Sequence, residues 1–172
     1  MEVLLENMFI KRFCLPSDID IDNIPKETYY NMNNCLCGHY NHVSCVFKNG
    51  NGKNMKKIQI LGFGINKYAD VEGNNPGVHA EKDVLMKLPY LKLKKRLMSI
   101  NILVIRFSKT NKLQNSKPCC HCIREMELLP KRRGYKIQNI LYSDSDGNII
   151  KTSLRNLQEE EQHLSRFYRK RT

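Results

Sequence analysis

Apolar and β-branched residues gather in five short runs that predict strands. The run at 100–107, INILVIRF, is almost unbroken, which is typical of a strand covered on both faces of a sheet. The five predicted strands cover residues 42–47, 57–65, 100–107, 136–143 and 148–154.

Two turn sequences predict which of these strands pair as hairpins. KNGNGK (48–53) lies between the first two runs and carries Asn-Gly twice. DSDG lies before the last run, and its Asp146-Gly147 pair predicts a tight turn. We therefore expect an antiparallel hairpin at each end of the set.

Apolar residues recur at helical spacing in four other segments. Pro130 is expected to end the predicted helix at 119–129. The segment from 16 to 34 is polar, holds two prolines and is interpreted as a loop. The predicted helices are residues 3–13, 78–88 and 119–129, and the chain from about Asn156 onward.

This order of elements predicts an α/β fold in which helices pack against a central sheet. We expect three parts along the chain. Residues 1–34 form an N-terminal helix and loop extension, 35–155 form the main domain, and 156–172 form a basic helix packed on that domain.

The net charge of +12 narrows the choice of partners. At 172 residues the chain suits one domain, and no apolar run approaches the roughly 18 residues of a membrane span. MEVLLENMFIKRF lacks the pattern of a signal peptide. The basic runs KLKKR, KRR and RFYRKR favour phosphate-bearing partners such as nucleotides or nucleic acid. A solvated basic face is the alternative.

Seven cysteines are an odd number, and most of them are clustered. This pattern argues against a secreted disulfide framework. It favours metal binding or thiol chemistry in a reducing, intracellular compartment.

Two short motifs begin the two central helices: His79-Ala80-Glu81, and PCCHC at 118–122. Cys119 and Cys122 are three residues apart and project from one side of a helical turn. With His79 they supply one nitrogen and two sulfur ligands, which leaves a fourth tetrahedral position open, as in catalytic zinc sites. Glu81 is close enough to exchange a proton with a zinc-bound water, whose pKa is about 7.

Other potential ligands have less specific patterns. Cys120 and His121 are interpreted as bystanders on the other side of the turn. CLCGHYNH could form a second, structural zinc site, although its spacing is tighter than that of common zinc fingers. The ligands of that site would be Cys35, Cys37, His39 and His42.

The combination H-x-E and P-C-x-x-C is the signature of zinc deaminases. From about Cys37 to Leu154 the chain resembles the cytidine deaminase-like superfamily. The resemblance implies a three-layer αβα fold with a mixed five-stranded sheet whose last two strands form an antiparallel hairpin. It also implies that Asn66, in GFGIN, contacts the substrate sugar and that the backbone of Ala80 contacts the pyrimidine.

SKPCCHC and YSDSDGNI also resemble uncharacterised deaminase-like proteins of large DNA viruses and some eukaryotes. This second resemblance implies no substrate. It is compatible with a cytoplasmic protein or with a virion component.

Three functions follow from these patterns. The first is a zinc-dependent hydrolytic deaminase of a cytosine-containing nucleoside or nucleotide. An antiparallel last strand resembles that of the free-nucleoside branch of the superfamily. The second is a deaminase of transfer RNA or single-stranded nucleic acid, which the basic charge and Asn66 favour. The third is a deaminase fold used as a structural component of a larger assembly, such as a virion or ribonucleoprotein. Relatives are often oligomers, so a homo-oligomer is also possible.

Overall fold

A computed structural model describes residues 41–49, 58–67, 77–92, 96–108, 112–165 and 169. The predicted helix at 3–13, the loop that follows it and most of the basic tail lie outside these ranges. The predicted boundary at residue 34 lies outside them as well.

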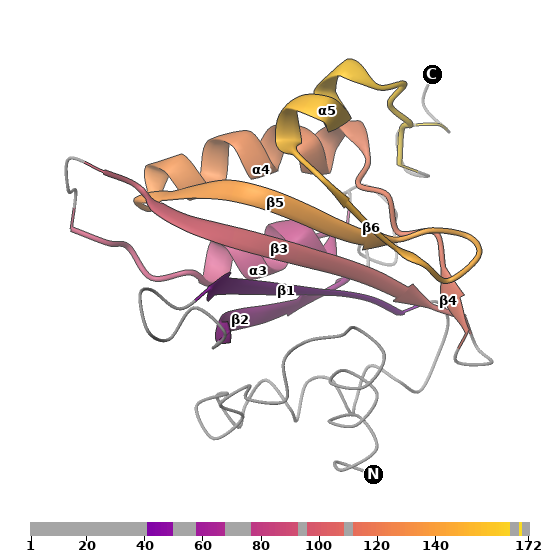
Figure 1. Ribbon diagram of the computed structural model, residues 1–172, viewed down its shortest axis with the longest axis horizontal. Helices are drawn as coiled ribbons and strands as arrows, with labels where there is room; N and C mark the ends of the chain where they lie inside the picture. The colour runs from indigo at the N-terminus through magenta and orange to yellow at the C-terminus, as the bar shows by residue number, and fades with distance from the viewer. Residues whose placement is uncertain are drawn as a thin grey trace, which may run out of the picture.

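The described residues form a mixed α/β structure around one sheet of six strands, in the order β2-β1-β3-β5-β6 with β4 beside β3 (Figure 1). The strands are β1 (Asn41–Asn49), β2 (Ile58–Ile65), β3 (Met98–Phe107), β4 (Leu113–Gln114), β5 (Tyr135–Ser143) and β6 (Ile149–Thr152).

Both predicted hairpins are confirmed. β1 pairs antiparallel with β2, and β5 pairs antiparallel with β6. In the DSDG turn, Gly147 has φ +86° and lies in the left-handed region that glycine adopts without strain. The two central strands, β3 and β5, run parallel. The sheet is therefore mixed, as predicted.

The predicted number of five strands is wrong, because β4 adds a sixth. β4 has two residues and pairs antiparallel with Arg106 and Phe107 at the end of β3. Two residues carry no detectable hydrophobic period, so the pattern along the chain could not predict this strand.

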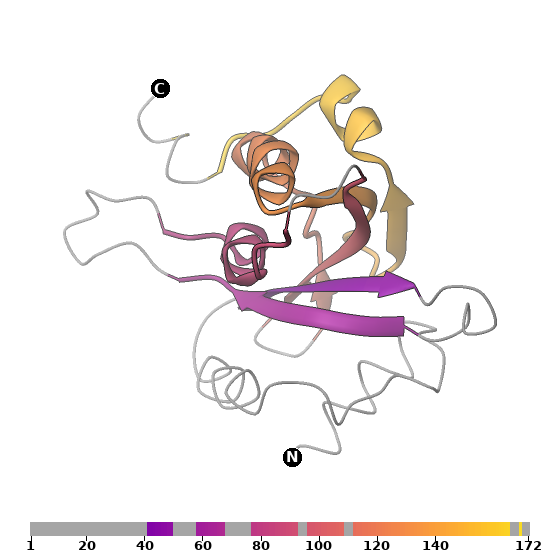
Figure 2. The same cartoon turned by 90° about the vertical axis from the view of Figure 1, so that its left-hand side faces the viewer.

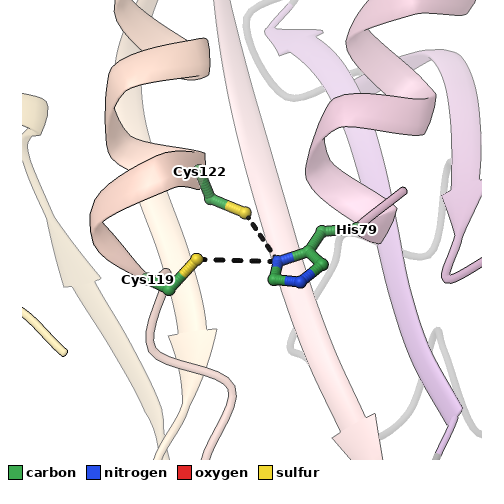
Figure 3. Close-up of side chains that lie close together, drawn as sticks. All are labelled: His79, Cys119 and Cys122. Carbon is green, nitrogen blue, oxygen red and sulfur yellow. Dashed lines mark hydrogen bonds between the residues drawn. The ribbon is translucent and has the colours of Figure 1, made fainter. Parts of the chain in front are cut away.

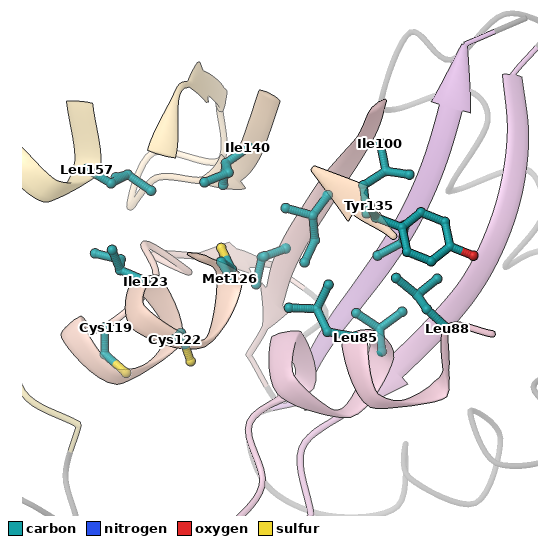
Figure 4. Close-up of a cluster of buried hydrophobic side chains, with 14 residues drawn as sticks. Leu85, Leu88, Ile100, Cys119, Cys122, Ile123, Met126, Tyr135, Ile140 and Leu157 are labelled. Atoms are coloured by element: carbon teal, nitrogen blue, oxygen red, sulfur yellow. The ribbon is translucent and has the colours of Figure 1, made fainter. Parts of the chain in front are cut away.

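Among the described residues, three helices pack on one face of the sheet: α3 (Ala80–Lys87), α4 (Cys120–Arg132) and α5 (Leu154–Glu159). α3 and α4 lie side by side over the strands, and α5 packs beside α4 (Figure 2). All three share one buried cluster with the inner face of the strands, as Figure 4 shows for Leu85, Met126 and Leu157. None of the helices in the described ranges has the length and apolar character needed to cross a membrane.

The opposite face of the sheet carries a second apolar cluster. Alternate residues of β3 supply the two faces: Ile102 and Val104 belong to the helical side, and Leu103 and Ile105 to the other. β3 is thus buried on both faces, as its unbroken apolar run predicted. The described helices form one layer. The other helix predicted from the sequence, residues 3–13, lies outside the described ranges, so the three-layer arrangement stays a prediction.

Contrary to the prediction, α4 does not end at Pro130 but continues to Arg132. Gly134, with φ +91°, is where the chain leaves the helix. The N–H groups of Arg133 and Gly134 donate to the carbonyls of Pro130 and Lys131, which closes the last turn. A proline this near the end of a helix removes only one backbone hydrogen bond, so the helix tolerates it.

The last strand and last helix also differ from their predicted bounds. β6 ends at Thr152, and Ser153 caps α5 by accepting a hydrogen bond from the N–H of Asn156. Leu157 is fully buried in the helical cluster. α5 ends at Glu159, where consecutive glutamates meet the negative end of the helix dipole. Residues 161–165 are not helical.

α3 packs directly on the backbone of β2 at Gly64. A Cβ at this position would lie 2.2 Å from the carbonyl oxygen of Ala80 and 2.5 Å from the N of Val84. Only glycine allows this approach, because both neighbours are backbone atoms of the helix. Gly64 thus determines how close the first turn of α3 comes to the sheet.

Asp83 connects α3 to the end of β2. Its buried carboxylate accepts a hydrogen bond from the N–H of Ile65 and lies 2.6 Å from the Nζ atoms of both Lys67 and Lys87. Burial alone would raise the pKa of Asp83, but the hydrogen bonds from the lysines and Ile65 outweigh it and lower the pKa below the ordinary 3.8. The charged form is therefore the one that stabilises the fold.

We expect Asp83→Asn to lower the free energy of unfolding by about 1–2 kcal/mol at pH 7, since both ion pairs are lost although the lysines are half exposed. A lowered pKa in the folded state contributes stability above the unfolded pKa of about 3.9, and this contribution is lost as the pH falls further. The difference between wild type and variant should be constant above about pH 5 and should shrink below about pH 4.

Urea denaturation at several pH values measures this difference. Glu159→Gln is the matched control, because it removes an exposed ion pair with Arg155 and should change stability by less than about 0.5 kcal/mol. A difference for Asp83→Asn that grows as the pH falls would contradict the expected sign.

Candidate metal centre

His79, Cys119 and Cys122 lie together between the first turns of α3 and α4 (Figure 3). Their ligand atoms are all within 4.8 Å of one another. The Nδ1 atom of His79 is 3.1 Å from the Sγ of Cys122 and 3.6 Å from the Sγ of Cys119. A tetrahedral zinc ion would separate such a nitrogen and sulfur by about 3.5 Å, so the three side chains fit a metal ion such as zinc.

The cluster has two halves, a histidine half with His79 and a cysteine half with Cys119 and Cys122. Both lie at the N-terminal ends of helices. His79 is the N-cap residue of α3, and Cys119 is the N-cap residue of α4. Neither side chain caps its own helix by a hydrogen bond, so the imidazole and the thiol remain directed at each other. The first N–H of each helix is engaged, that of Ala80 by Asn66 and that of Cys120 by the carbonyl of His163. The positive end of the helix dipole at these positions favours a thiolate.

Three contacts hold the histidine half. The amide oxygen of Asn66 accepts a hydrogen bond from the N–H of Ala80 at 2.8 Å, and Ser44 Oγ donates to the carbonyl of Ala80 at 2.6 Å. Gly64 allows the same turn to rest on β2. The predicted residues Asn66 and Ala80 are thus adjacent to His79. Sequence patterns gave no signal for Ser44.

A serine pair holds the cysteine half. Ser116 precedes the PCCHC motif and is buried. Its Oγ lies 2.8 Å from both the carbonyl of Val104 and the Oγ of Ser143. The N–H of Ser143 donates to Ser116 Oγ, and the N–H of Ser116 donates to the carbonyl of Ser143. The ends of β3 and β5 therefore determine where Cys119 begins its helix.

The two thiols of the cluster differ in acidity. A hydrogen bond with Cys122 and the neighbouring His79 lower the pKa of Cys119, although burial opposes them. The hydrogen bond with Cys119 and burial raise the pKa of Cys122. The bond to Cys119 raises the pKa of His79, while burial lowers it. A thiolate is the form of cysteine that binds metal, so Cys119 is prepared for that role.

Glu81 lies two residues beyond His79, in the first turn of α3, and its side chain is buried. Its Oε2 atom has no hydrogen-bond partner among the described residues. Burial raises the pKa of this carboxyl group, and the nearby Cys119 raises it further, while His79 lowers it. A buried carboxylate oxygen without a partner beside a metal-binding cluster is suited to hold or pass a proton.

His42 is a neighbour of the cluster. The sequence pattern predicts it as a ligand of a possible second zinc site. It is the second residue of β1 and pairs across the sheet with Arg106 of β3. Burial, and then the charges of Arg106 and His79, lower the pKa of His42 to about 4, so its imidazole is neutral at pH 7. The other ligands of the predicted second zinc site, Cys35, Cys37 and His39, lie outside the described residues, and that site stays a prediction.

Cys120 and His121 do not belong to the cluster. The Sγ of Cys120 lies 3.3 Å from Nδ1 of His121, and both side chains are partly exposed. This agrees with their interpretation as bystanders.

These positions predict which cysteines bind metal. We expect Cys119→Ser and Cys122→Ser each to weaken zinc binding by more than about 100-fold, because losing a ligand should cost more than losing an outer-shell partner. Cys120→Ser, a thiol removed from the same helical turn, should leave the affinity unchanged. Competition with a chromophoric chelator measures all three. Equal losses for the three variants would show that the metal is held by another set of ligands.

A His/Cys/Cys group of this kind occurs in zinc deaminases. The chain matches no protein-family model, no curated protein and no solved structure.

Proposed function

We propose that this protein is a zinc-dependent hydrolytic deaminase acting on a cytosine-containing nucleoside or nucleotide. The observation that carries the proposal is the joint position of His79, Cys119, Cys122 and the buried Glu81 at two adjacent helix N-termini. One nitrogen and two sulfur ligands, with a fourth position left for water, are typical of catalytic rather than structural zinc sites.

His79, Cys119 and Cys122 would hold the metal. When bound, zinc supplies a Lewis acid that lowers the pKa of a water molecule to about 7. Hydrolysis forms a bond from the water oxygen to C4 of cytosine and breaks the bond from C4 to the exocyclic nitrogen. The products are the uracil-containing nucleoside or nucleotide and ammonia.

Glu81 would move the protons of this reaction. Its carboxylate takes one proton from the attacking water and delivers it to the ring nitrogen N3. It then takes the second proton from the oxygen on C4 and delivers it to the leaving amine. A raised pKa supports this role, because a shuttle must both accept and release a proton near neutral pH. The Oε2 atom without a partner among the described residues is the atom that we assign to this transfer.

Asn66 and Ala80 would position the substrate. The amide oxygen of Asn66 is engaged by the N–H of Ala80, so its NH₂ group is the part that would meet a sugar hydroxyl. The carbonyl of Ala80 accepts from Ser44, which fixes the first turn of α3 on the sheet. Ser44 and Asn66 thereby orient the backbone that would contact the base.

The antiparallel β6 supports a monomeric substrate, since it resembles the free-nucleoside branch of the superfamily. A polynucleotide substrate is the alternative, and the net charge of +12 is the observation that favours it.

The decisive experiment measures ammonia release by zinc-loaded protein. The panel contains cytidine, deoxycytidine, their monophosphates, adenosine, guanine and short single-stranded oligonucleotides. Turnover of a cytosine monomer would support the main proposal, and turnover of oligonucleotides alone would support the alternative. No release from any of these substrates, with the zinc content verified, would overturn both.

A further inference from the structure

A cavity lies at the end of the sheet opposite the metal centre. It has a volume of about 620 Å³. The cavity lies where β1 ends, where β3 begins, and beside the turn that joins α4 to β5. Pockets of about 300–1,000 Å³ are the usual size for small-molecule sites. This one is therefore large enough for a nucleotide.

The lining of this cavity is strongly basic. Lys48, Lys92 and Arg96 contribute to it, and among the described residues that line it there is no acidic side chain. Within the described part of the chain, none of the three forms an ion pair. Three cations around one hollow attract an anion, and their field is focused by the low-dielectric wall behind them.

The floor of the cavity is held by backbone contacts. The N–H of Leu91 donates to the carbonyl of Arg133, and the N–H of Met98 donates to the carbonyl of Gly134. A Cβ on Gly134 would lie 2.9 Å from the Cβ of Leu91, so glycine is needed for this close approach. The guanidinium of Arg133 donates a hydrogen bond to the carbonyl of Leu88. This satisfies a backbone acceptor that has no partner within the helix at the end of α3.

The remaining lining suits the other parts of a nucleotide. Leu91, Leu97 and Met98 provide apolar surface on which a base can rest, while Asn49 and Ser99 offer hydrogen bonds to a sugar or a phosphate. This combination of cations, amide and hydroxyl groups and apolar surface favours a nucleotide over an inorganic anion.

The cavity is separate from the metal centre. α4 begins beside Cys119 and its end leads into the cavity at Gly134, and Figure 1 shows both central helices running between these two ends of the sheet. At 1.5 Å per residue this distance is about 20 Å. A ligand in the cavity cannot touch His79 or Glu81.

We propose that this cavity binds the phosphate of a nucleotide, either free or as a unit of single-stranded nucleic acid. Lys48, Lys92 and Arg96 contact the phosphate, and the apolar floor contacts the base. The site is independent of the deaminase proposal, because binding here requires neither the metal nor an amino group on the base.

Thymine compounds test the site without involving deamination, since thymine carries no exocyclic amine. The probes are thymidine 5′-monophosphate, thymidine and a short oligothymidylate, each titrated calorimetrically against the full chain. Thymidine 5′-monophosphate should bind, and thymidine should bind more weakly because it lacks the phosphate. Lys48→Gln/Lys92→Gln should weaken binding of the monophosphate about tenfold.

Lys112→Gln/Lys151→Gln is the matched control, because it removes the same charge from exposed positions outside the cavity. It should leave the affinity unchanged, and both double variants should melt at the temperature of the wild type. For oligothymidylate, the slope of log K against log salt should fall by about 1.4 in the cavity variant, which corresponds to two lost phosphate contacts.

The probes also distinguish the two sources of the phosphate. Tighter binding of oligothymidylate than of the monophosphate identifies nucleic acid as the ligand, and equal binding identifies a free nucleotide. Equal weakening in the cavity and control variants would mean general charge attraction and would overturn the site. Wild-type affinity in the cavity variant would overturn it as well.

Discussion

Glu81→Gln should reduce deaminase turnover by about 10²- to 10⁴-fold while leaving one zinc ion bound per chain. Glutamine has the shape of glutamate but cannot accept and release the proton that the reaction transfers. The metal ligands are other residues, so zinc content should not change. The same replacement should not unfold the protein, because it removes the cost of burying a carboxylate whose pKa is already raised by burial.

Glu125→Gln is the control for this variant. Glu125 lies on α4 and forms a partly exposed ion pair with Lys82, so its replacement should leave kcat within about twofold of wild type. Steady-state ammonia release and metal analysis on the same preparations provide the test. Glu81→Gln with wild-type turnover would remove Glu81 from the mechanism. Loss of zinc together with turnover would assign it a structural role.

Gly64→Ala should lower the free energy of unfolding by about 3 kcal/mol or more and weaken zinc binding. The added Cβ would overlap with backbone atoms of α3, which cannot turn aside as a side chain can. The helix must then move away from β2. That movement displaces His79, which begins the same helix, from the two cysteines on α4.

Gly62→Ala is an informative control, because it lies two residues away on the same face of the same strand. A Cβ at position 62 would lie 3.8 Å from Cγ2 of Val84, an ordinary contact. Its stability should stay within about 1 kcal/mol of wild type. Urea denaturation and zinc titration compare the two variants. Equal effects would mean that the loss of strand glycine, rather than its closeness to α3, is responsible.

Local patterns predicted most of the described elements. β3 was expected at 100–107 and spans 98–107, and β5 was expected at 136–143 and spans 135–143. These strands are buried on one or both faces, so their apolar residues form long runs. The helix expected at 78–88 is α3, at 80–87. Asn-Gly and Asp-Gly predicted both hairpins because few residues accept the backbone of tight turns.

The errors occur where a non-local contact overrides a local signal. β4 exists because Leu113 and Gln114 meet the end of β3, which no pattern in two residues records. Pro130 is a helix breaker in general, but two further residues complete the last turn before Gly134 ends it. Ser153 is a capping residue that outweighs the β-branched run before it.

The sequence predicted the potential metal ligands of the candidate site. It did not predict the residues that hold those ligands in place. His79, Cys119 and Cys122 could be named because metal ligands are few in type and regular in spacing. Ser44 and Ser116 could not, because a serine that holds a loop by a hydrogen bond resembles any other serine in the sequence. The separation of the three ligand atoms also depends on the close approach at Gly64.

The two halves of the metal centre are positioned by different parts of the sheet. His79 is positioned by contacts with β1 and β2, whereas Cys119 is positioned by the ends of β3 and β5. These residues are 40 positions apart in the chain, so neither half can assemble the site alone. A metal ion bound here acts as a cross-link between an early hairpin and a later parallel pair of strands. Its binding energy therefore contributes to the cooperativity with which the two halves fold together.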